Sequence, residues 1–378
     1  MMIRMGDPVK HVVFAHRKLS FGGGERVLIE QVAALAELPV RVSILFNKEP
    51  DRRDIEAELR ERNPHVETVL HLPGAFGAWR WLRRARPDLL VLCNHKGVQR
   101  ALPWVGRRIP TVVTLHEHYE RHLAKYRAIR RRVDRWIITW AFEDAVRKCL
   151  GDQPCSLIHP VYPRQGALPP TAEEKRAARR ELGLPEDAFV VGYAGQMDRR
   201  KDPAAVIALS ESLERALGRE IHVLLAGRED RHAQDSLDAA LAHSPLAARV
   251  RRTGPLPRLA QAFIALDLYA MTSRNEGFFP IALLEAMERG VPIIAPTVGG
   301  IRTQLVDGRG GLLIHKPDDR QPIAPALLED AAQRAAALIR DPEAWATQKA
   351  LAIEQAASLA KDYDAAALFR DAVAAWIP

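Results

Sequence analysis

Two glutamates in one short segment, residues 274–287, give the strongest chemical signal in the sequence. The segment reads Arg-Asn-Glu-Gly-Phe-Phe-Pro-Ile-Ala-Leu-Leu-Glu-Ala-Met, with Glu276 in a predicted loop and Glu285 in a helix predicted to start near Pro280. The backbone amides between them belong to Gly277, Phe278 and Phe279. Such amides suit phosphate or sugar oxygens, and a carboxylate can accept hydrogen bonds from both hydroxyls of a ribose. A plain surface glutamate is the alternative for either residue alone.

A second segment, residues 195–203, groups three cations after a predicted strand. It reads Gly-Gln-Met-Asp-Arg-Arg-Lys-Asp-Pro, and a helix is predicted to begin at Pro203. Adjacent cations repel one another, so their grouping favours an anion among them. At the carboxyl end of a strand, Arg200 and Lys201 could neutralise a diphosphate. A solvated turn is the alternative.

Glycine turns precede two further predicted helices. Residues 21–26 read Phe-Gly-Gly-Gly-Glu-Arg, and residues 296–301 read Pro-Thr-Val-Gly-Gly-Ile. Glycine lets the backbone approach a ligand closely, and the helix N-terminus that follows attracts anions. Gly23 and Gly24 are therefore candidate binding residues, although a simple connecting turn would have the same glycine pattern. The spacing is not that of a dinucleotide site, so NAD is not predicted.

Short apolar runs alternate with longer amphipathic stretches, which predicts parallel sheets covered by helices. The predicted strands are residues 11–15, 40–46, 89–93, 111–115 and 156–158 in the first half, and 190–194, 222–226, 250–253, 268–271, 292–295 and 311–314 in the second. Predicted helices include residues 25–38, 75–85, 203–217 and 280–289. An alanine-rich tail from 324 to 376 is predicted to form three helices, with breaks near Asp341 and Lys361.

Length and a proline-rich break divide the chain. Its 378 residues exceed one ordinary core, and residues 160–170 carry prolines that cannot continue a sheet. We predict one domain of residues 1–165 and a second of 166–361, with the last helix, 362–378, free to pack back on the first. The predicted fold class is α/β, with two doubly wound (Rossmann-like) parallel-sheet domains facing across a cleft. Because ligands bind beyond the carboxyl ends of such strands, the cleft is the expected site.

Composition indicates a globular protein with one basic half. Hydrophobic residues make up 47% and charged residues 27%, which is typical of a folded domain. No run approaches the roughly 20 apolar residues of a membrane span, and residues 1–8 lack the apolar core of a signal peptide, so we expect a cytoplasmic location. Residues 1–165 hold 29 Lys and Arg against 18 Asp and Glu, whereas residues 166–378 hold 26 against 29. The three cysteines show no paired spacing, which favours neither disulfides nor a zinc site.

Part of the basic excess falls in residues 121–140. Its cations are interleaved with apolar residues every three or four positions, which predicts one amphipathic helix over this segment. Such a helix can lie on an anionic membrane and would place the protein peripherally on the inner face. A helix packed on its own sheet, with a solvated basic face, is the alternative. No recognised nucleic-acid-binding motif is present, so nucleic acid is not a predicted partner.

Together, these motifs resemble the retaining, nucleotide-sugar-dependent glycosyltransferases of family four, which have the GT-B fold. The segments that carry the resemblance are residues 22–26, 114–116, 200–202, 276–278, 284–287 and 298–300. Their order and rough separations match the family from residue 11 to about residue 314. The glutamate segment with the glycine turn that follows it is the most specific part.

The resemblance implies that the domain of residues 1–165 binds the acceptor and that of residues 166–361 binds the nucleotide-sugar donor. It also implies a role for each candidate residue. Lys201, with Arg200, would hold the donor diphosphate, and Glu285 would hold the ribose. Glu276 and the amides that follow it would face the transferred sugar, and His116 would lie near the reacting carbon without ligating a metal. The implied enzyme needs no cofactor: a nucleoside diphosphate sugar is the co-substrate, and the reaction is metal-independent.

Three positions depart from the family pattern or invite another interpretation. The family places seven residues between its glutamates, whereas eight separate Glu276 from Glu285. Gln196 stands where an arginine is common, so Arg199 or its neighbour would supply that charge. The Asp-Tyr-Asp run that ends at Asp364 superficially suggests a metal-binding pair, but we interpret it as a helix cap.

The leading hypothesis is retaining transfer of a hexosyl group from a nucleoside diphosphate sugar to a glycan or lipid-linked acceptor, in the synthesis of surface polysaccharide or glycoconjugate. One alternative is a GT-B-fold nucleotide-sugar epimerase or phosphorylase. Another alternative is a catalytically silent GT-B binding module, which is consistent with the irregular eight-residue spacing between Glu276 and Glu285. The base, the sugar, the acceptor and the oligomeric state are left open by the sequence.

Overall fold

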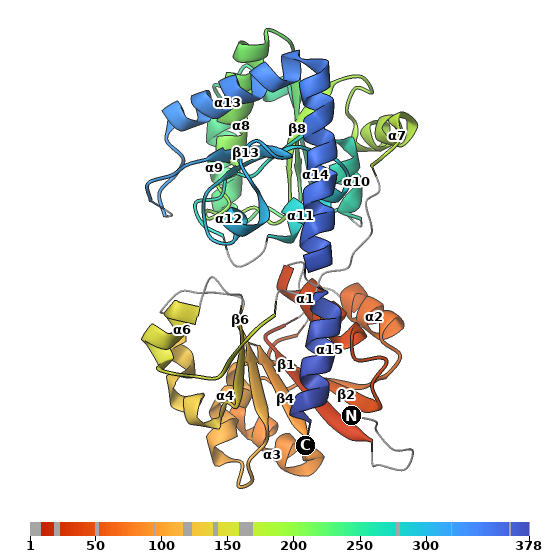
Figure 1. Cartoon of the computed structure of the whole chain (residues 1–378), viewed down its shortest axis with the longest axis vertical. Coiled ribbons are helices and arrows are strands. Elements are labelled where there is room, and N and C mark those ends of the chain that lie inside the picture. Colours follow the sequence, from red (N-terminus) through yellow and green to blue (C-terminus); the bar gives the residue numbers. More distant parts are fainter. Residues whose placement is uncertain are drawn as a thin grey trace. The chain divides into compact units, whose positions relative to one another are not determined.

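The chain divides into two compact units, each built on a parallel sheet (Figure 1). The computed structural model describes residues 9–18, 23–49, 53–93, 95–115, 123–138, 143–158, 169–256, 258–276, 280–318, 320–362 and 364–377. The N-terminal unit comprises Met1–Pro163 with Tyr363–Pro378, and the C-terminal unit comprises Arg164–Asp362. The predicted linker, 160–170, lies largely outside the described residues.

The N-terminal unit contains a seven-stranded parallel sheet in the order β3-β2-β1-β4-β5-β6-β7. Its strands are β1 Lys10–His16, β2 Val40–Phe46, β3 Val66–His71, β4 Leu89–Cys93, β5 Thr111–Thr114, β6 Arg135–Ile138 and β7 Cys155–Leu157. Strands β3 and β6 were not among the predicted ones. Strand β3 is an edge strand that is buried only at Val66, which gives it little apolar signal.

Helices flank this sheet, and one of them comes from the far end of the chain. They are α1 Gly23–Ala33, α2 Arg53–Arg62, α3 Ala75–Ala85, α4 Lys96–Ala101, η1 Leu102–Trp104, η2 Ala124–Arg132, α6 Glu143–Leu150 and α15 Ala365–Trp376. Phe369 and Val373 of α15 are fully buried in the core, where Phe369 lies 6.3 Å from the ring of Phe14. Burial of such side chains stabilises the unit by roughly 1.5–3 kcal/mol each.

The C-terminal unit contains a six-stranded parallel sheet in the order β10-β9-β8-β11-β12-β13. Its strands are β8 Phe189–Ala194, β9 Ile221–Ala226, β10 Val250–Gly254, β11 Leu268–Ala270, β12 Ile293–Pro296 and β13 Gly311–Ile314, so all six predicted strands are confirmed. The helices are α7 Ala172–Leu182, α8 Ala204–Leu217, α9 Arg231–Leu241, η4 Ala247–Arg249, α10 Ala260–Ala265, α11 Ile281–Glu288, α12 Ile301–Gln304, α13 Pro325–Arg340 and α14 Pro342–Asp362.

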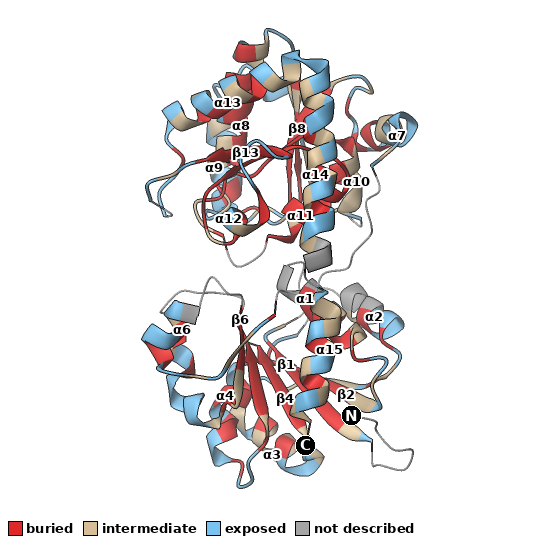
Figure 2. Cartoon of the chain, in the orientation of Figure 1, coloured by how far each residue is buried: buried red, intermediate tan, exposed pale blue. Residues whose placement is uncertain are grey.

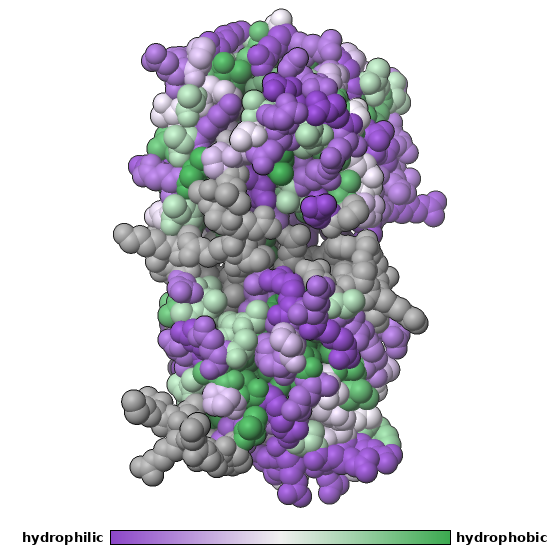
Figure 3. Space-filling model, turned by 90° about the vertical axis from the view of Figure 1, so that its right-hand side faces the viewer, coloured by the Kyte–Doolittle hydropathy of each residue, from purple (hydrophilic) through white to green (hydrophobic). Residues whose placement is uncertain are grey.

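Helices cover both faces of the C-terminal sheet. Helix α8 packs against α9 and α13, whereas α10 packs against α7 and α11. The inner strands β8 and β9 are largely buried, and the outward helix faces are exposed (Figure 2). On the face that Figure 3 shows, hydrophilic residues are interspersed with smaller groups of hydrophobic ones. Both units therefore have the predicted doubly wound α/β fold.

Strand order reverses once in each sheet. In the N-terminal unit the chain winds from β1 through β2 to the edge strand β3, then crosses back to β4 beside β1. In the C-terminal unit it winds from β8 through β9 to β10 and crosses back to β11 beside β8. The loops after the two central strands diverge at such a point and leave room for a ligand. The sites are therefore expected beyond β1 and β4 in one unit and beyond β8 and β11 in the other.

The predicted helix over residues 25–38 is displaced toward the N-terminus. Helix α1 begins at Gly23 and ends at Ala33. Beyond it the backbone tightens, with Leu35 N–H bonded to the carbonyl of Val32 and Leu38 N–H to that of Leu35. The next residue is Pro39, and a proline disfavours helical geometry in the residue before it. The glycines predicted to lie in a loop therefore form the first turn of the helix.

The predicted amphipathic helix over residues 121–140 is wrong. The described part forms the 3-10 helix η2 and then strand β6. The buried residues Leu123, Tyr126 and Ile129 recur every three positions, which matches the three residues per turn of a 3-10 helix. The apolar run from Trp136 to Ile138 pairs with both β5 and β7. The basic segment is therefore split between a surface helix and a buried strand.

In the C-terminal tail the predicted three helices are confirmed. Helices α13, α14 and α15 follow one another, with breaks at Asp341 and between Asp362 and Ala365. Asp364 accepts a hydrogen bond from Ala367 N–H and caps α15, as the interpretation of this aspartate predicted. Cys93, Cys149 and Cys155 all lie in the described residues, and none of them forms a disulfide.

We expect Gly227→Ala to destabilise the C-terminal unit by more than about 2 kcal/mol. Gly227 has φ of +135°, and a Cβ atom there would lie 1.9 Å from the carbonyl oxygen of Gly195. The matched control is Gly218→Ala at the end of α8, where φ is +67° and an added Cβ atom would have no neighbour within 4 Å. Its expected loss of stability is about 1 kcal/mol, from the backbone conformation alone. Urea unfolding followed by circular dichroism measures both. Equal losses of stability in the two variants would contradict the close approach of Gly227 to the carbonyl oxygen of Gly195.

Candidate functional site

The candidate residues of the C-terminal unit lie at its switch point. The segment after β8 carries Arg200 and Lys201, and the segment after the neighbouring strand β11 carries Glu276. The two segments are joined by the backbone, because Arg274 N–H donates to the carbonyl of Arg200 at 2.7 Å. Parallel strands thus bring together residues that lie 75 positions apart in sequence.

An unusual backbone conformation shapes the first of these segments. Asp202 has φ of +49°, a left-handed value that few residues other than glycine adopt. Its carbonyl accepts a hydrogen bond from Thr272 Oγ1 at 2.8 Å, and its carboxylate accepts one from Arg274 Nε at 2.9 Å. Lys201 N–H donates to Asp198 Oδ1 at 2.9 Å. These bonds hold the turn in place and fix the direction of Lys201.

A buried ion pair links the two segments. Lys201 Nζ contacts Glu276 Oε1, and Ser273 Oγ donates to the same oxygen. The side chains of Lys201 and Glu276 are only 14% and 4% exposed. Burial of either charge alone would cost several kcal/mol, so each charge stabilises the other. A carboxylate and an ammonium are therefore held in fixed positions at the edge of the sheet.

Ionisation of this pair reflects burial and charge together. Burial opposes ionisation of Glu276, but Lys201 and Arg200 outweigh it, and the pKa of Glu276 falls below its ordinary value. Burial also lowers the pKa of Lys201, which Glu276 partly counteracts. Glu276 is consequently a carboxylate at neutral pH.

Two stacked tyrosines lie at this edge of the sheet. The rings of Tyr193 and Tyr269 are 6.0 Å apart and nearly parallel. Burial raises the pKa of both hydroxyls well above the ordinary value, and Glu276 adds to that effect at each. Glu285 also raises the pKa of Tyr269, which places both glutamates within electrostatic reach of one hydroxyl. The two predicted carboxylates therefore belong to one region.

The remaining candidates differ in how the structure places them. Arg200 is exposed, and its guanidinium lies 3.8 Å from Asp198. Glu285 is almost fully buried on α11. Gly23 and Gly24 form the start of α1. Four predicted site residues lie outside the described residues: His116, Gly277, Phe278 and Phe279.

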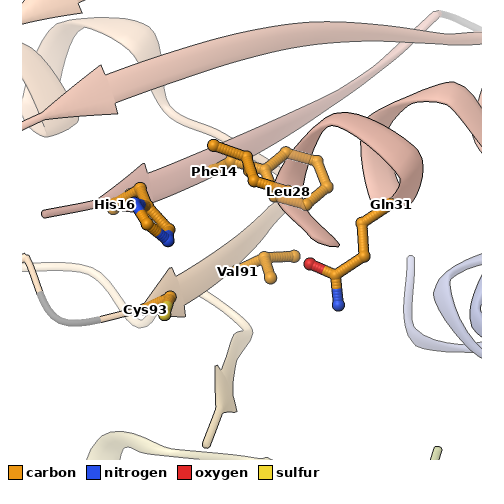
Figure 4. A pocket seen from close by; sticks show the side chains of 7 residues that line it. Phe14, His16, Leu28, Gln31, Val91 and Cys93 are labelled. Carbon is orange, nitrogen blue, oxygen red and sulfur yellow. The ribbon is translucent and has the colours of Figure 1, made fainter. Parts of the chain in front are cut away.

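The N-terminal unit places polar side chains at its own switch point. His16 ends β1, and His95 follows β4 as the N-cap of α4. His16 lines a small cavity with Gln31 and Cys93, and these three side chains come from β1, α1 and β4 (Figure 4). The sequence analysis missed both histidines, although a polar residue directly after a buried strand is a signal that could have found them.

Both histidines are buried and neutral. Burial is the largest cause that lowers the pKa of each from 6.5 to about 4. His16 Nδ1 contacts the carbonyl of Lys18 at 3.2 Å, so its Nε2 is an acceptor, whereas His95 Nδ1 accepts from Val98 N–H at 3.1 Å, so its Nε2 is a donor. Among the described residues, neither Nε2 has a hydrogen-bond partner. The same holds for Gln99 Nε2 and Thr114 Oγ1, so uncharged donors and acceptors are buried at this edge.

Two further features concern the described residues as a whole. Nowhere in these ranges do three or more His, Cys, Asp or Glu side chains gather where they could hold a metal ion. Of the helices in the same ranges, none is both long and apolar enough to cross a membrane.

Comparison with known proteins assigns the chain to a family. Residues 174–337 match the model of the glycosyl transferases group 1, and residues 21–148 match that of Glycosyltransferase Family 4. The chain belongs to glycosyltransferase family 4. The first match contains Lys201, Glu276 and Glu285, and the second contains Gly23 and His116.

Similar sequences agree with this assignment. The chain is 35% identical over 175 residues to the D-inositol 3-phosphate glycosyltransferase of Stackebrandtia nassauensis, and 37% over 193 residues to that of Thermobispora bispora. These matches cover 44% and 48% of this chain but only 39% and 42% of the relatives, so the chain spans about two fifths of the curated relatives that it matches.

Two solved structures show the same fold. Anabaena Alr3699/HepE, in complex with UDP and glucose, has a TM-score of 0.75 at 20% identity and covers 96% of this chain and 98% of its own. Sucrose-phosphate synthase from Thermosynechococcus elongatus has a TM-score of 0.72 at 21% identity, with 97% and 100% covered. Both matches extend over the two units, and the family-4 chain therefore has the GT-B fold.

We expect Lys201→Met to lower the free energy of unfolding of the C-terminal unit by about 3 kcal/mol at pH 7, because Glu276 is left as a buried, unpaired carboxylate. Addition of Glu276→Gln should restore most of that loss, since no buried charge then remains. Urea unfolding of the two single variants and the double variant gives the coupling energy. If the loss in the double variant equals the sum of the losses in the two single variants, the pair carries no coupling.

We expect the N-terminal unit to lose stability as the pH falls from about 6.5 to about 4. The unfolded chain protonates its histidines near pH 6.5, whereas folded His16 and His95 resist protonation until about pH 4. The unfolded state thus binds more protons in this window, and each histidine accounts for up to about 3 kcal/mol. Tryptophan fluorescence during urea unfolding reports mainly on this unit, because six of the seven tryptophans lie outside the C-terminal unit.

The double variant His16→Gln and His95→Asn should flatten this pH dependence, with asparagine retaining the helix cap at position 95. The matched control is His243→Gln, which changes an exposed histidine in the turn after α9. An unaltered pH dependence in the double variant would show that His16 and His95 do not cause it.

Proposed function

We propose that the chain is a retaining hexosyltransferase that uses a nucleoside diphosphate sugar as donor. The observation that carries the proposal is the convergence of Lys201, Arg200 and Glu276 at the switch point of the C-terminal sheet. Cations at this place meet the negative charge that develops on a departing diphosphate. The family and the UDP complex of Anabaena Alr3699/HepE support a donor of this class.

Each residue has a proposed role. Lys201 and Arg200 bind the diphosphate, and the carboxylate of Glu285 binds the ribose hydroxyls. Glu276 and the amides that follow it orient the transferred sugar, while His116 bonds the sugar near its reacting carbon. The protein's own cations meet the phosphate charge, so the proposed reaction needs no metal ion or other cofactor.

The proposed reaction takes place on one face of the sugar. The bond between the anomeric carbon and the diphosphate oxygen breaks, and a bond to an acceptor hydroxyl forms on the same face. The acceptor proton passes to the departing phosphate, so the configuration is retained. The acceptor is a glycan or a lipid-linked saccharide in surface polysaccharide or glycoconjugate synthesis. We place the acceptor on the N-terminal unit, where His16 ends β1 and His95 caps α4 at the switch point.

A thermal-shift screen in metal-free buffer tests the donor site. UDP, GDP, ADP and their sugars are compared at millimolar concentration, and we expect one nucleotide to raise the melting temperature selectively. Binding at one hundred times Kd stabilises the native state by about 2.7 kcal/mol. Lys201→Ala should abolish the shift. The matched control is Arg215→Ala, which removes a cation from an exposed ion pair on α8 and should leave the shift intact.

Glu276→Gln tests the catalytic role. This variant should still bind the selected nucleotide. It should cleave the nucleotide sugar at least about 100-fold more slowly than the unmodified chain, both with an added acceptor and without one. Unchanged turnover would remove Glu276 from the site. The absence of a shift with every nucleotide would favour a silent binding module, and interconversion of the donor sugar without transfer would favour an epimerase. Nuclear magnetic resonance of the product's anomeric centre tests retention.

A further inference from the structure

An exposed group of aromatic and basic side chains covers one part of the N-terminal unit. Phe76 is 72% exposed at the start of α3, and Trp104 is 78% exposed at the end of η1. With Trp79, Arg83 and Arg132 they form what we call the aromatic–basic patch. Large apolar side chains at this level of exposure mark an interaction surface when they are contiguous.

The patch is contiguous through direct contacts. The rings of Phe76 and Trp79 are 5.6 Å apart, and Trp79 Nε1 donates to the carbonyl of Trp104 at 3.1 Å. The guanidinium of Arg83 lies 5.0 Å from the Trp79 ring centroid. Arg132 donates to the carbonyl of Pro103, next to Trp104, at 3.2 Å. Helices α3 and α4 pack against each other (Figure 1), and η1 follows α4 directly in sequence.

The four helices that form and border the patch carry charge of one sign. Helices α3, α4, η1 and η2 contain ten Lys and Arg and no Asp or Glu. The carboxylates that follow α3 and η2 in sequence, Asp88 and Asp134, pair with Lys10 and Arg108, which lie outside these helices. The patch therefore combines exposed aromatic rings with a strongly positive surrounding surface.

This combination matches the chemistry of an anionic lipid surface. Aromatic rings are favoured at the level of the headgroups, and each nearby cation contributes about 1 kcal/mol of attraction to acidic lipid. A second copy of the chain would bring two positive surfaces together, which charge repulsion disfavours. We propose that the aromatic–basic patch docks the N-terminal unit on an anionic membrane surface, with Phe76 and Trp104 entering the headgroup region.

The residues of the patch differ from those of the rejected helix over 121–140. Phe76 and Trp104 lie outside that segment, and only Arg132 is shared with it. The proposal does not rest on the donor chemistry, because none of its residues belongs to the ion-pair site. Its failure would therefore leave the proposed transferase activity untouched.

Vesicle sedimentation tests the proposal. The full chain is mixed with vesicles of equal parts phosphatidylglycerol and phosphatidylcholine, or of phosphatidylcholine alone, at about 0.1 M salt. We expect binding to the anionic vesicles only. Phe76→Ser with Trp104→Ser should weaken that binding at least about tenfold, because two aromatic anchors are lost. Arg80→Gln with Arg83→Gln should weaken binding most strongly at low salt.

The matched control changes two other exposed apolar residues, Leu157→Ser on β7 and Val306→Ser in the C-terminal unit, and should bind like the unmodified chain. All variants should keep the melting temperature and the nucleotide-induced shift, which separates loss of docking from loss of folding or of donor binding. Three results would overturn the proposal: no binding to anionic vesicles, equal loss in the patch and control variants, or tighter patch-dependent binding to single-stranded RNA than to vesicles.

Discussion

A charge pair held out of water organises the candidate site. Lys201 and Glu276 come from segments that follow different strands, and neither charge is stable when buried without the other. Their contact requires the turn before α8 to keep the left-handed backbone of Asp202, which Thr272 and Arg274 hold by hydrogen bonds. The pair, the turn and the two strand ends are thus one cooperative arrangement. A preorganised ammonium of this kind is what stabilisation of a departing diphosphate requires.

Both units place polar groups where strand order reverses, but the chemistry of the two places differs. The C-terminal unit presents buried charges, whereas the N-terminal unit presents neutral histidines with free hydrogen-bonding capacity among the described residues. Charges suit a phosphorylated ligand, and neutral donors and acceptors suit hydroxyl groups. Under the proposed function, one fold used twice would supply a donor site and an acceptor site.

The success of the sequence predictions follows from the strength of the local signal. Most strands of the C-terminal unit, such as β8 and β12, are short buried apolar runs between clear helices, so their existence and order along the chain could be predicted. The prediction of one amphipathic helix over residues 121–140 failed because apolar spacings of three and four residues are nearly indistinguishable over a short stretch. In the structure, Leu123, Tyr126 and Ile129 follow the three-residue period of a 3-10 helix. Edge strand β3 buries too little to produce a pattern.

Local residue types determined which groups could do chemistry: the two glutamates, the cations after β8 and the glycine turns were all visible in sequence, as was the family resemblance. Only the tertiary structure decided which of them meet. Lys201 contacts Glu276 because β8 and β11 are neighbours in the sheet, a pairing that no local period encodes. In the same way, the apolar face of α15 is evident in sequence, but its packing on the core around Phe14 depends on long-range burial. The aromatic–basic patch likewise exists only because α3, η1 and η2, which are separated in sequence, contact one another in the fold.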